Sequence, residues 1–492
     1  MKYISTRGGA CQHVRTGPDQ NGLSFDDVLL AGLARDGGLY VPAAWPRFSA
    51  GQIAGFAGQC YADVALAVMR PFIGADVSEA ELKSMVSAAY ATFGHAAVAP
   101  LVQIGPGDWM LELFHGPTLA FKDIAMQMLG RLMDRTLSAH GRRATIVGAT
   151  SGDTGGAAIE AFRGRSAIDI FILFPQGRVS DVQRRQMTTP TEVNVHAIAV
   201  KGTFDDCQNI VKAMFNDLEL RDRLQLAGVN SINWARIMAQ VVYYFTAAVA
   251  LGSPHRKVSF SVPTGNFGDI FAGYVAWKMG LPIERLIIAT NANDILVRTL
   301  TTGRYEPKGA VATTSPSMDI QISSNFERLL FELTGRDAAR VRQLMNALSG
   351  QDGFVLKDAE MTELRSLFSA HRADESAVQR TIAELYKGTG YLADPHTAVG
   401  IAAAKATVRA AGVPVVTLAT AHPAKFPQAV MAAAGVAPLE PVSVRAQKAA
   451  DERFVVLPND ITAIARYVTS RTRASMPPTP SQTSKTTART PE

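Results

Sequence analysis

The residue of this chain best suited to covalent chemistry is a lysine beside an apolar helix pattern. Lys122 closes the run His-Gly-Pro-Thr-Leu-Ala-Phe-Lys, and the apolar residues after it have the spacing of a half-buried helix. Gly116 and Pro117 predict a turn, and Thr118 is predicted to cap a helix that carries Lys122 in its first turn. Burial lowers a lysine pKa toward the neutral amine that Schiff-base chemistry needs. A lone lysine more often extends to solvent, so this interpretation depends on other motifs.

Three glycine- or hydroxyl-rich loops each follow an apolar strand pattern. They are Thr150–Gly156, Pro263–Asp269 and Thr420–Lys425, and a helical pattern follows each of the first two. Loops at the carboxyl ends of strands collect free N–H groups at helix N-termini and therefore bind anions. Glycine in such a loop lets the backbone approach the ligand closely. These loops predict sites for phosphate or carboxylate groups.

Two common nucleotide-binding motifs are absent from the sequence. No G-x-G-x-x-G opens a helix with an acidic residue at the required distance, and no G-x-x-x-x-G-K-[ST] occurs. A buried lysine combined with several anion-binding turns instead suits pyridoxal 5'-phosphate. This cofactor needs an amine for its aldehyde and a cradle for its phosphate.

The chain resembles threonine synthases of the bacterial and fungal type, which have an extended N-terminal domain. The matching segments run in order along most of the chain: Tyr3–Gly8, Gly32–Pro42, Phe121–Asp123, Ser151–Gly155, Asn230–Arg236, Pro263–Asp269, Asp394–Ala398 and Ala421–Phe426. The resemblance implies a fold-type II pyridoxal-phosphate enzyme, similar to the tryptophan synthase β subunit. Such an α/β fold has two open, mostly parallel lobes with the cofactor between them.

The hydrophobic pattern agrees with an α/β fold. Helical patterns occupy Phe25–Leu33, Cys60–Phe72 and Glu79–Phe93, so the sequence predicts a helix-rich N-terminal domain. Short apolar strands then alternate with helices, which favours open parallel sheets. The predicted strands span residues 108–114, 144–149, 168–174, 194–200, 257–262, 285–290 and 414–419.

The predicted domain boundaries follow from these patterns. Residues 1–95 form the N-terminal domain, and residues 96–440 form the two-lobed catalytic region. A helical insertion is predicted at about 325–387, because its patterns lack intervening strands. A closing segment follows at 441–469. Residues 470–492 are rich in Ser, Thr, Pro and Arg, and we expect them to be disordered because they cannot bury enough apolar surface.

The resemblance also implies which residues bind the cofactor. Lys122 is expected to form the Schiff base and then to act as the main acid and base. Thr420 is expected to hydrogen-bond the pyridine nitrogen. The cofactor phosphate is expected to lie against Gly265, Asn266, Phe267 and Asp269. A carboxylate repels a phosphate, so the backbone N–H of Asp269 is the expected contact and its side chain is expected to cap the helix. Asp123 is interpreted as a helix-start carboxylate favoured by the dipole.

The resemblance assigns further residues to the substrate. The loop residues expected to face the cofactor ring and the substrate carboxylate are Ser151, Asp153 and Thr154. The candidates for the substrate phosphate are Asn233 and Arg236, with Lys425 and His396 behind them. The planar guanidinium of arginine matches phosphate geometry, although an ordinary surface arginine on the helix from Asn233 to Leu251 is the alternative.

The implied reaction converts O-phospho-L-homoserine and water to L-threonine and phosphate. It is a γ-elimination followed by β-hydration, and it is the last step of threonine biosynthesis. One alternative is a phospho-lyase that stops at elimination and yields 2-oxobutyrate, ammonia and phosphate; only product analysis separates the two. The other is a non-catalytic binding protein on this scaffold. The presence of Lys122 and of the Pro263–Asp269 loop argues against it.

Composition excludes several other classes of protein. The chain has 492 residues, 47% apolar and 19% charged, which is ordinary for a globular enzyme. Its net charge is +6, and the last 22 residues supply half of this excess. No basic stripe with interleaved aromatic residues occurs elsewhere, so we expect no nucleic-acid partner.

The spacing of the cysteines, the histidines and the apolar residues gives no sign of disulfides, a metal or a membrane span, and we expect a protein of the reducing cytoplasm. Three widely spaced cysteines predict no disulfide framework, and nine scattered histidines lack metal-ligand spacing, so no metal is expected. There is no signal-peptide pattern, and the apolar stretch Val241–Leu251 is too short to cross a bilayer, so no membrane partner is expected. The sequence leaves open whether the protein is a monomer or a homodimer.

Overall fold

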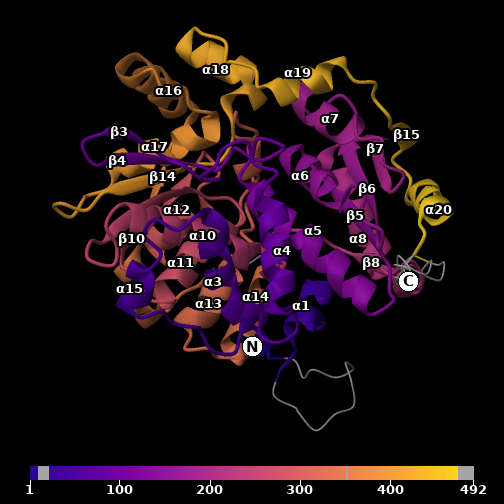
Figure 1. Cartoon of the computed structure of the whole chain (residues 1–492), viewed down its shortest axis with the longest axis horizontal. Coiled ribbons are helices and arrows are strands. Elements are labelled where there is room, and N and C mark those ends of the chain that lie inside the picture. Colours follow the sequence, from indigo (N-terminus) through magenta and orange to yellow (C-terminus); the bar gives the residue numbers. More distant parts are fainter. Residues whose placement is uncertain (9–21, 351–352, 475–492) are drawn as a thin grey trace, which may run out of the picture.

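Two open sheets form the frame of the molecule. The computed structural model describes residues 1–8, 22–350 and 353–474 (Figure 1). The larger sheet has the strand order β13-β10-β9-β14-β4-β3 and is parallel except for β3. Its strands are β3 (Leu101–Gly105), β4 (Asp108–Glu112), β9 (Val258–Pro263), β10 (Ile283–Thr290), β13 (Phe368–Arg372) and β14 (Val415–Ala419).

The smaller sheet is parallel throughout and has the order β15-β7-β6-β5-β8. Its strands are β5 (Ala144–Ala149), β6 (Ile168–Pro175), β7 (Val195–Lys201), β8 (Leu226–Ala227) and β15 (Val455–Pro458). Two antiparallel ladders lie outside these sheets. They pair β1 (Tyr3–Ser5) with β2 (Tyr40–Pro42), and β11 (Arg304–Tyr305) with β12 (Phe354–Val355).

Helices flank both sheets. Those before β9 are α1 (Phe25–Ala31), α2 (Ala50–Ala54), α3 (Tyr61–Ile73), α4 (Glu79–Tyr90), α5 (Lys122–Ala139), α6 (Asp153–Phe162), α7 (Asp181–Thr188), α8 (Phe204–Asn216), α9 (Leu218–Leu224) and α10 (Trp234–Ala250). Those after it are α11 (Gly268–Lys278), α12 (Ile295–Thr302), η1 (Pro316–Met318), α13 (Phe326–Leu333), α14 (Ala338–Ser349), α15 (Asp358–Leu367), α16 (Glu375–Thr389), α17 (Pro395–Ala406), η2 (Pro423–Lys425), α18 (Pro427–Ala434), α19 (Val442–Ala449) and α20 (Ile461–Arg471).

Strand β10 shows why the strands of the larger sheet are almost continuously apolar. Leu286 and Ile288 belong to the core that contains α10 and α11. Ile287 and Ala289 belong to a second core with residues of α16 and α17. Successive side chains of a strand point to opposite faces, so both faces of this sheet are covered by helices.

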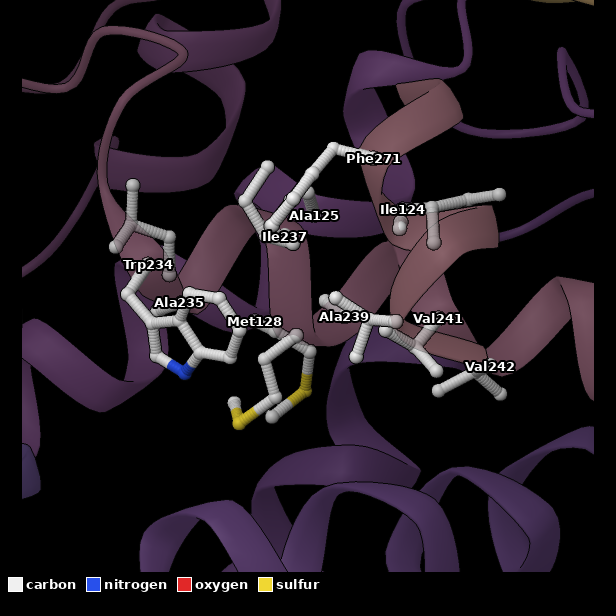
Figure 2. Close-up of a cluster of buried hydrophobic side chains, with 14 of the residues drawn as sticks. Ile124, Ala125, Met128, Trp234, Ala235, Ile237, Ala239, Val241, Val242 and Phe271 are labelled. Atoms are coloured by element: carbon white, nitrogen blue, oxygen red, sulfur yellow. The ribbon is translucent and has the colours of Figure 1, made fainter. Parts of the chain in front are cut away.

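A shared core fixes the N-terminal ends of α5 and α10. Figure 2 shows Ile124 and Met128 of α5 grouped with Trp234 and Ile237 of α10, with Phe271 of α11 beside them. All five side chains are fully buried. Removing apolar area from water in this way stabilises the packing at roughly 25 cal/mol per Å². The two helix ends therefore have fixed positions, and both carry predicted site residues.

Most predicted elements are present in the structure. The predicted strands correspond to β4, β5, β6, β7, β9, β10 and β14, and the three N-terminal helices to α1, α3 and α4. The prediction that residues 325–387 lack strands is wrong, because β13 lies there and pairs with β10 at the sheet edge. Its sequence, Phe-Ser-Ala-His-Arg, is only partly apolar since an edge strand is less buried.

The C-terminal expectation needs a partial correction. Ser470 and Arg471 end α20, and the guanidinium of Arg473 forms an ion pair with Asp169 at 2.8 Å. Residues 470–474 are therefore placed, because the carboxylate of Asp169 is almost fully buried and needs a partner. The rest of the tail predicted to be disordered, 475–492, lies outside the described residues. Within the described ranges, no helix combines the length and apolar character needed to cross a membrane.

Candidate active site

The carboxyl ends of β4, β14 and β9 bring together the loops in which the sequence predicted chemistry. These strands are parallel neighbours, so the loops that follow them leave the same edge of the larger sheet. The lysine loop follows β4, the Thr420 loop follows β14, and the Pro263–Asp269 loop ends β9. The Thr420 loop also bonds the lysine loop directly, because the N–H of Phe121 donates to the carbonyl of Thr420 at 2.8 Å.

Lys122 is the first residue of α5, and its side chain is buried. Its Nζ lies 3.5 Å from the hydroxyl of Ser317 and 3.8 Å from a carboxylate oxygen of Asp153. Burial lowers the pKa of Lys122 to about 8, although the charge of Asp153 opposes this shift. The positive charges of Lys425 and Arg236 lower it further. Lys122 therefore provides a neutral amine at a pH where an ordinary lysine is protonated.

The predicted cap of this helix is wrong in one respect. Thr118 does not cap α5, which begins four residues later with Phe121 at the cap position. Instead, the N–H and the hydroxyl of Thr118 both donate to the carboxylate of Asp123, at 2.8 and 2.6 Å. Asp123 is fully buried, and burial raises its pKa to about 6. This carboxylate folds the loop before Lys122 onto the first helical turn.

Asp153 links two buried ammonium groups. One of its oxygens lies 2.7 Å from Nζ of Lys425, whose side chain is fully buried, and the other faces Lys122. The amide of Gln183 on α7 donates to the same carboxylate at 2.9 Å. Burial alone would raise the pKa of Asp153, but the two lysines hold it well below its usual value. Asp153 is therefore an anion that balances two lysines.

The other two residues predicted in this loop have accessible side chains. Ser151 is exposed, and Thr154 is partly buried in the first turn of α6. Between Ser151 and Asp153, Gly152 has φ 146°, and a Cβ there would collide with the side chain of Gln183. Only glycine fits this close approach, which holds the Ser151 main chain against α7.

The Pro263–Asp269 loop is shaped to present backbone to a ligand. Phe267 precedes α11 with φ 62°, a left-handed conformation that is rare for an aromatic residue, and its ring packs on Phe326 at 5.2 Å. The side chain of Asn266 is exposed. A Cβ on Gly265 would lie 2.9 Å from the carbonyl oxygen of Ser317. Within the described residues, no side chain caps the start of α11, so its first N–H groups, beside the turn that carries Ser317, are suited to an anion.

The side chain of Asp269 does not cap α11, contrary to the expectation from the sequence. Its carboxylate accepts hydrogen bonds from the hydroxyls of Tyr243 and Tyr244 of α10. Burial raises the pKa of Asp269 to about 7. The two tyrosines therefore hold this side chain in place, and its backbone N–H is the group available to a phosphate.

Thr420 is buried at the end of β14. Its N–H donates to the hydroxyl of Thr397 at 3.3 Å, and its carbonyl accepts from Phe121. Among the described residues, these hydrogen bonds use only the main chain of Thr420. The hydroxyl of Thr420 is therefore free to bond a ligand atom.

Of the predicted pair Asn233 and Arg236, only Arg236 has a side-chain group free to bind a ligand. The side chain of Asn233 caps α10 through the N–H of Ala235 and donates to the carbonyl of Leu29 at 2.9 Å, so it is already engaged. Arg236 is buried, and burial lowers its pKa to about 10. Within the part of the chain that the structure describes, its Nε has no hydrogen-bond partner. A buried guanidinium with a free N–H is suited to an anionic ligand.

Some residues of this site were not predicted from the sequence, and Ser317 is the most important of them. It lies in η1, a turn within a loop that has no repeating hydrophobic pattern. The only sequence signal is Ser315-Pro-Ser317, in which the proline favours a turn. Gln183 and the two tyrosines lie in helices whose patterns indicate packing rather than chemistry. Spatial proximity alone reveals their roles.

These groups fit pyridoxal phosphate. A buried amine with a lowered pKa suits the aldehyde, and the cradle that excludes a Cβ at Gly265 suits the phosphate. The free hydroxyl of Thr420 suits the pyridine nitrogen. The cations Lys425 and Arg236 near Lys122 favour anions in the same space.

Three family descriptions match successive parts of the chain. Residues 2–90 match "Threonine synthase N terminus", residues 109–355 match "Pyridoxal-phosphate dependent enzyme", and residues 397–468 match "Threonine synthase, C-terminal". These ranges include Lys122, Thr420 and the Pro263–Asp269 loop.

Known proteins are similar to this chain over nearly its whole length. Threonine synthase from Pseudomonas aeruginosa is 51% identical over 478 residues, covering 97% of this chain and 100% of that protein. The crystal structure of pyridoxal-phosphate-bound threonine synthase from Brucella melitensis is 59% identical with a TM-score of 0.93, covering 96% of this chain and 100% of that one. The yeast threonine synthase structure is 38% identical with a TM-score of 0.89, covering 96% and 98%.

Proposed function

This chain belongs to the threonine synthase family of pyridoxal-phosphate-dependent lyases, and from that premise we propose how its own residues carry out the reaction. The proposed substrate is O-phospho-L-homoserine, which reacts with water to give L-threonine and phosphate. The observation that carries the proposal is the position of Lys122. Its buried amine lies 3.5 Å from Ser317, whose carbonyl approaches Gly265, and it is close enough to the buried cations Lys425 and Arg236 for their charges to lower its pKa.

When bound, pyridoxal phosphate supplies an aldehyde that binds an amino group and a conjugated ring that accepts electrons when protons leave carbon. We assign its phosphate to the backbone N–H groups of Gly265 to Asp269 and its pyridine nitrogen to the hydroxyl of Thr420. A hydroxyl cannot hold that nitrogen protonated as a carboxylate can. With Thr420 as its partner, the ring would be a weaker electron acceptor than in enzymes with an acidic partner.

Lys122 is the proposed acid and base for the substrate carbons. Its Nζ is buried, and its lowered pKa lets it both take and return a proton near neutral pH. The hydroxyl of Ser317, at 3.5 Å, holds the amine in place. Asp153 stays ionised beside it and keeps Lys425 from placing an unbalanced charge against the amine.

The substrate phosphate is assigned to Arg236, with Asn233 fixing the helix start from which Arg236 projects. Lys425 and His396 are secondary candidates for the substrate phosphate. Ser151 and Thr154 are assigned to the substrate carboxylate together with the backbone of Asp153, because α6 begins at Asp153 without a side-chain cap from Gly152 and a helix start favours an anion.

Product analysis tests the proposed reaction. Purified enzyme with O-phospho-L-homoserine should release phosphate and L-threonine in equal amounts. A phospho-lyase would instead yield 2-oxobutyrate and ammonia. Phosphate accompanied by 2-oxobutyrate, with threonine absent, would overturn the assignment as a synthase while leaving the cofactor site intact.

The lowered pKa of Lys122 predicts how fast cofactor-free protein takes up pyridoxal phosphate. Only the neutral amine attacks the aldehyde, so the second-order rate constant should rise about ten-fold per pH unit below the pKa. It should level off near pH 8, because burial lowers the pKa of Lys122 to about 8. Stopped-flow absorbance between pH 7 and 10.5 measures this. A rise that continues to the value of an ordinary lysine would contradict the prediction.

Replacing Arg236 tests the assignment of the substrate phosphate. Arg236→Gln should raise KM for O-phospho-L-homoserine by about 10- to 100-fold, because a hydrogen bond between charged groups contributes about 1.5–3 kcal/mol. Inhibition by inorganic phosphate should weaken by a similar factor, whereas kcat should change less. Arg142→Gln, on the exposed end of the loop before β5, is the matched control. Unchanged KM and unchanged phosphate inhibition would move the assignment to another residue.

A further inference from the structure

In the segment Asp394-Pro-His-Thr, only His396 has been considered so far for a role in the reaction, as a secondary candidate for the substrate phosphate. Asp394 caps α17, and its side chain is fully buried. Its carboxylate accepts hydrogen bonds from the main-chain N–H groups of His396 and Thr397, at 2.9 and 3.0 Å. An ordinary helix cap makes these bonds and no others. Here the same carboxylate also binds the side chains of both residues.

One of these additional bonds leads to Ser317. Asp394 binds Nδ1 of His396 at 2.7 Å, and Nε2 of the same ring accepts from the N–H of Ser317 at 3.3 Å. A nitrogen that accepts from a main-chain N–H carries no proton, so the proton of the neutral ring lies on Nδ1 and faces Asp394. The ring of Phe426 packs against the histidine at 4.9 Å. This arrangement fixes the tautomer and the orientation of His396.

The other bond leads to Thr420. The hydroxyl of Thr397 donates to Asp394 and accepts from the N–H of Thr420 at 3.3 Å. The carbonyl of Thr420 in turn accepts from Phe121, the residue before Lys122. This route fixes the strand end assigned to the pyridine nitrogen and the helix start that carries the amine.

We propose that Asp394 is a positioning residue that aligns two parts of the cofactor site through His396 and Thr397. The His396 route sets the distance between Ser317 and Nζ of Lys122. The Thr397 route sets the main chain of Thr420 and Phe121. Both routes end at Lys122, so one buried carboxylate controls where the amine lies relative to the group that binds the pyridine nitrogen. The role in turnover rests on the proposed function, whereas the role in positioning does not.

Amide hydrogen exchange in the full-length holoenzyme tests the two routes separately. The reporters are the donor amides themselves, those of Ser317 and Thr420. His396→Leu should speed exchange at Ser317 by about ten-fold, the expected cost of one hydrogen bond, and should leave Thr420 unchanged. Thr397→Val should do the reverse. Asp394→Asn should speed both, because the amide presents a single acceptor oxygen and cannot orient both side chains.

Conservative variants separate positioning from folding. Thr397→Ser keeps the hydroxyl and should restore protection at Thr420, and His396→Gln keeps an acceptor and should restore part of the protection at Ser317. Asp460→Asn, at the exposed cap of α20, is the control for loss of a capping charge. It should leave both reporter amides at wild-type rates.

Turnover provides the second readout. Asp394→Asn should lower kcat by about 10- to 100-fold, because small displacements of reacting groups have effects of this size. KM should change less than kcat, since the side-chain bonds of Asp394 go to His396 and Thr397 and not to Arg236, the residue assigned first to the substrate phosphate. The inference is overturned if Asp394→Asn only loosens the first turn of α17 and both reporter amides keep their wild-type exchange rates. If the wild-type protein makes no threonine but the exchange pattern holds, the proposed function fails and the positioning role stands.

Discussion

Lys122→Ala is expected to reduce kcat by at least ~10⁴-fold, because the variant lacks both the covalent attachment point of the cofactor and the proposed acid and base. The fold should be retained. Burial lowers the pKa of this lysine, which means that the folded protein holds its ammonium form less favourably than water does. The substitution therefore removes a charge that is costly to bury. The midpoint temperature of unfolding should decrease only by the small effect of the cavity that the shorter side chain leaves. Phosphate release and thermal unfolding followed by circular dichroism measure the two effects.

Borohydride reduction identifies the amine directly. It should attach the cofactor permanently to the peptide that contains Lys122. Lys425 is the important competitor, because it is also a buried ammonium and lies close to the same carboxylate. Attachment at Lys425 instead, or full activity of Lys122→Ala, would refute the assignment. Lys405→Ala, on the exposed side of α17, is the control and should behave as wild type.

Asp153→Asn is expected to lower the free energy of unfolding by about 3–5 kcal/mol, the usual cost of removing one partner from a buried ion pair. The variant would leave the fully buried ammonium of Lys425 without its anion, at a site where the two groups lie 2.7 Å apart. Turnover should also fall. Without the charge of Asp153, the pKa of Lys122 decreases further, and the amine becomes a weaker base. Equilibrium urea unfolding of the cofactor-free protein measures the stability change.

A second substitution separates charge from shape. Lys425→Met in the Asp153→Asn background should recover part of the lost stability, because it removes the unpaired buried charge. Asp181→Asn is the matched control, since it breaks an exposed pair with Arg184 and should cost less than about 1 kcal/mol.

The pKa of Asp153 is lowered in the folded state, so its stabilisation is present above the ordinary aspartate pKa and is lost as the pH falls. The wild type and variant should therefore converge in acid; equal stabilities at neutral pH would contradict the prediction.

The sequence predicted the components of the site better than their connections. Lys122 and the Pro263–Asp269 loop carry local signals, namely a lysine at a helix start and glycines after a strand. The contact between Thr118 and Asp123 could not be inferred in the same way, because capping threonines and threonines that bind a carboxylate have the same local pattern. The helix therefore begins later than predicted.

Long-range partners explain the other differences. Tyr243 and Tyr244 lie in an apolar stretch, and only the fold shows that their hydroxyls face Asp269. Ser317 is 195 residues from Lys122 along the chain and has no strand or helix pattern around it. β13 was missed because an edge strand with polar residues lacks the continuous apolar run of a central strand. Periodicity reports burial on one element and carries no information about which element lies opposite.

β15, the last strand among the described residues, affects which strand forms the edge of the smaller sheet. In Figure 1 the C-terminal segment passes from α18 across to the smaller sheet, where β15 pairs with β7. Ion pairs from Glu452 to Arg184 and from Arg473 to Asp169 anchor it at both ends. β15 pairs with residues 198–201 of β7, and without it β7 would form the edge of the sheet. The segment therefore replaces a seven-residue edge strand with one of four residues, and a short edge strand offers less backbone for pairing with another chain.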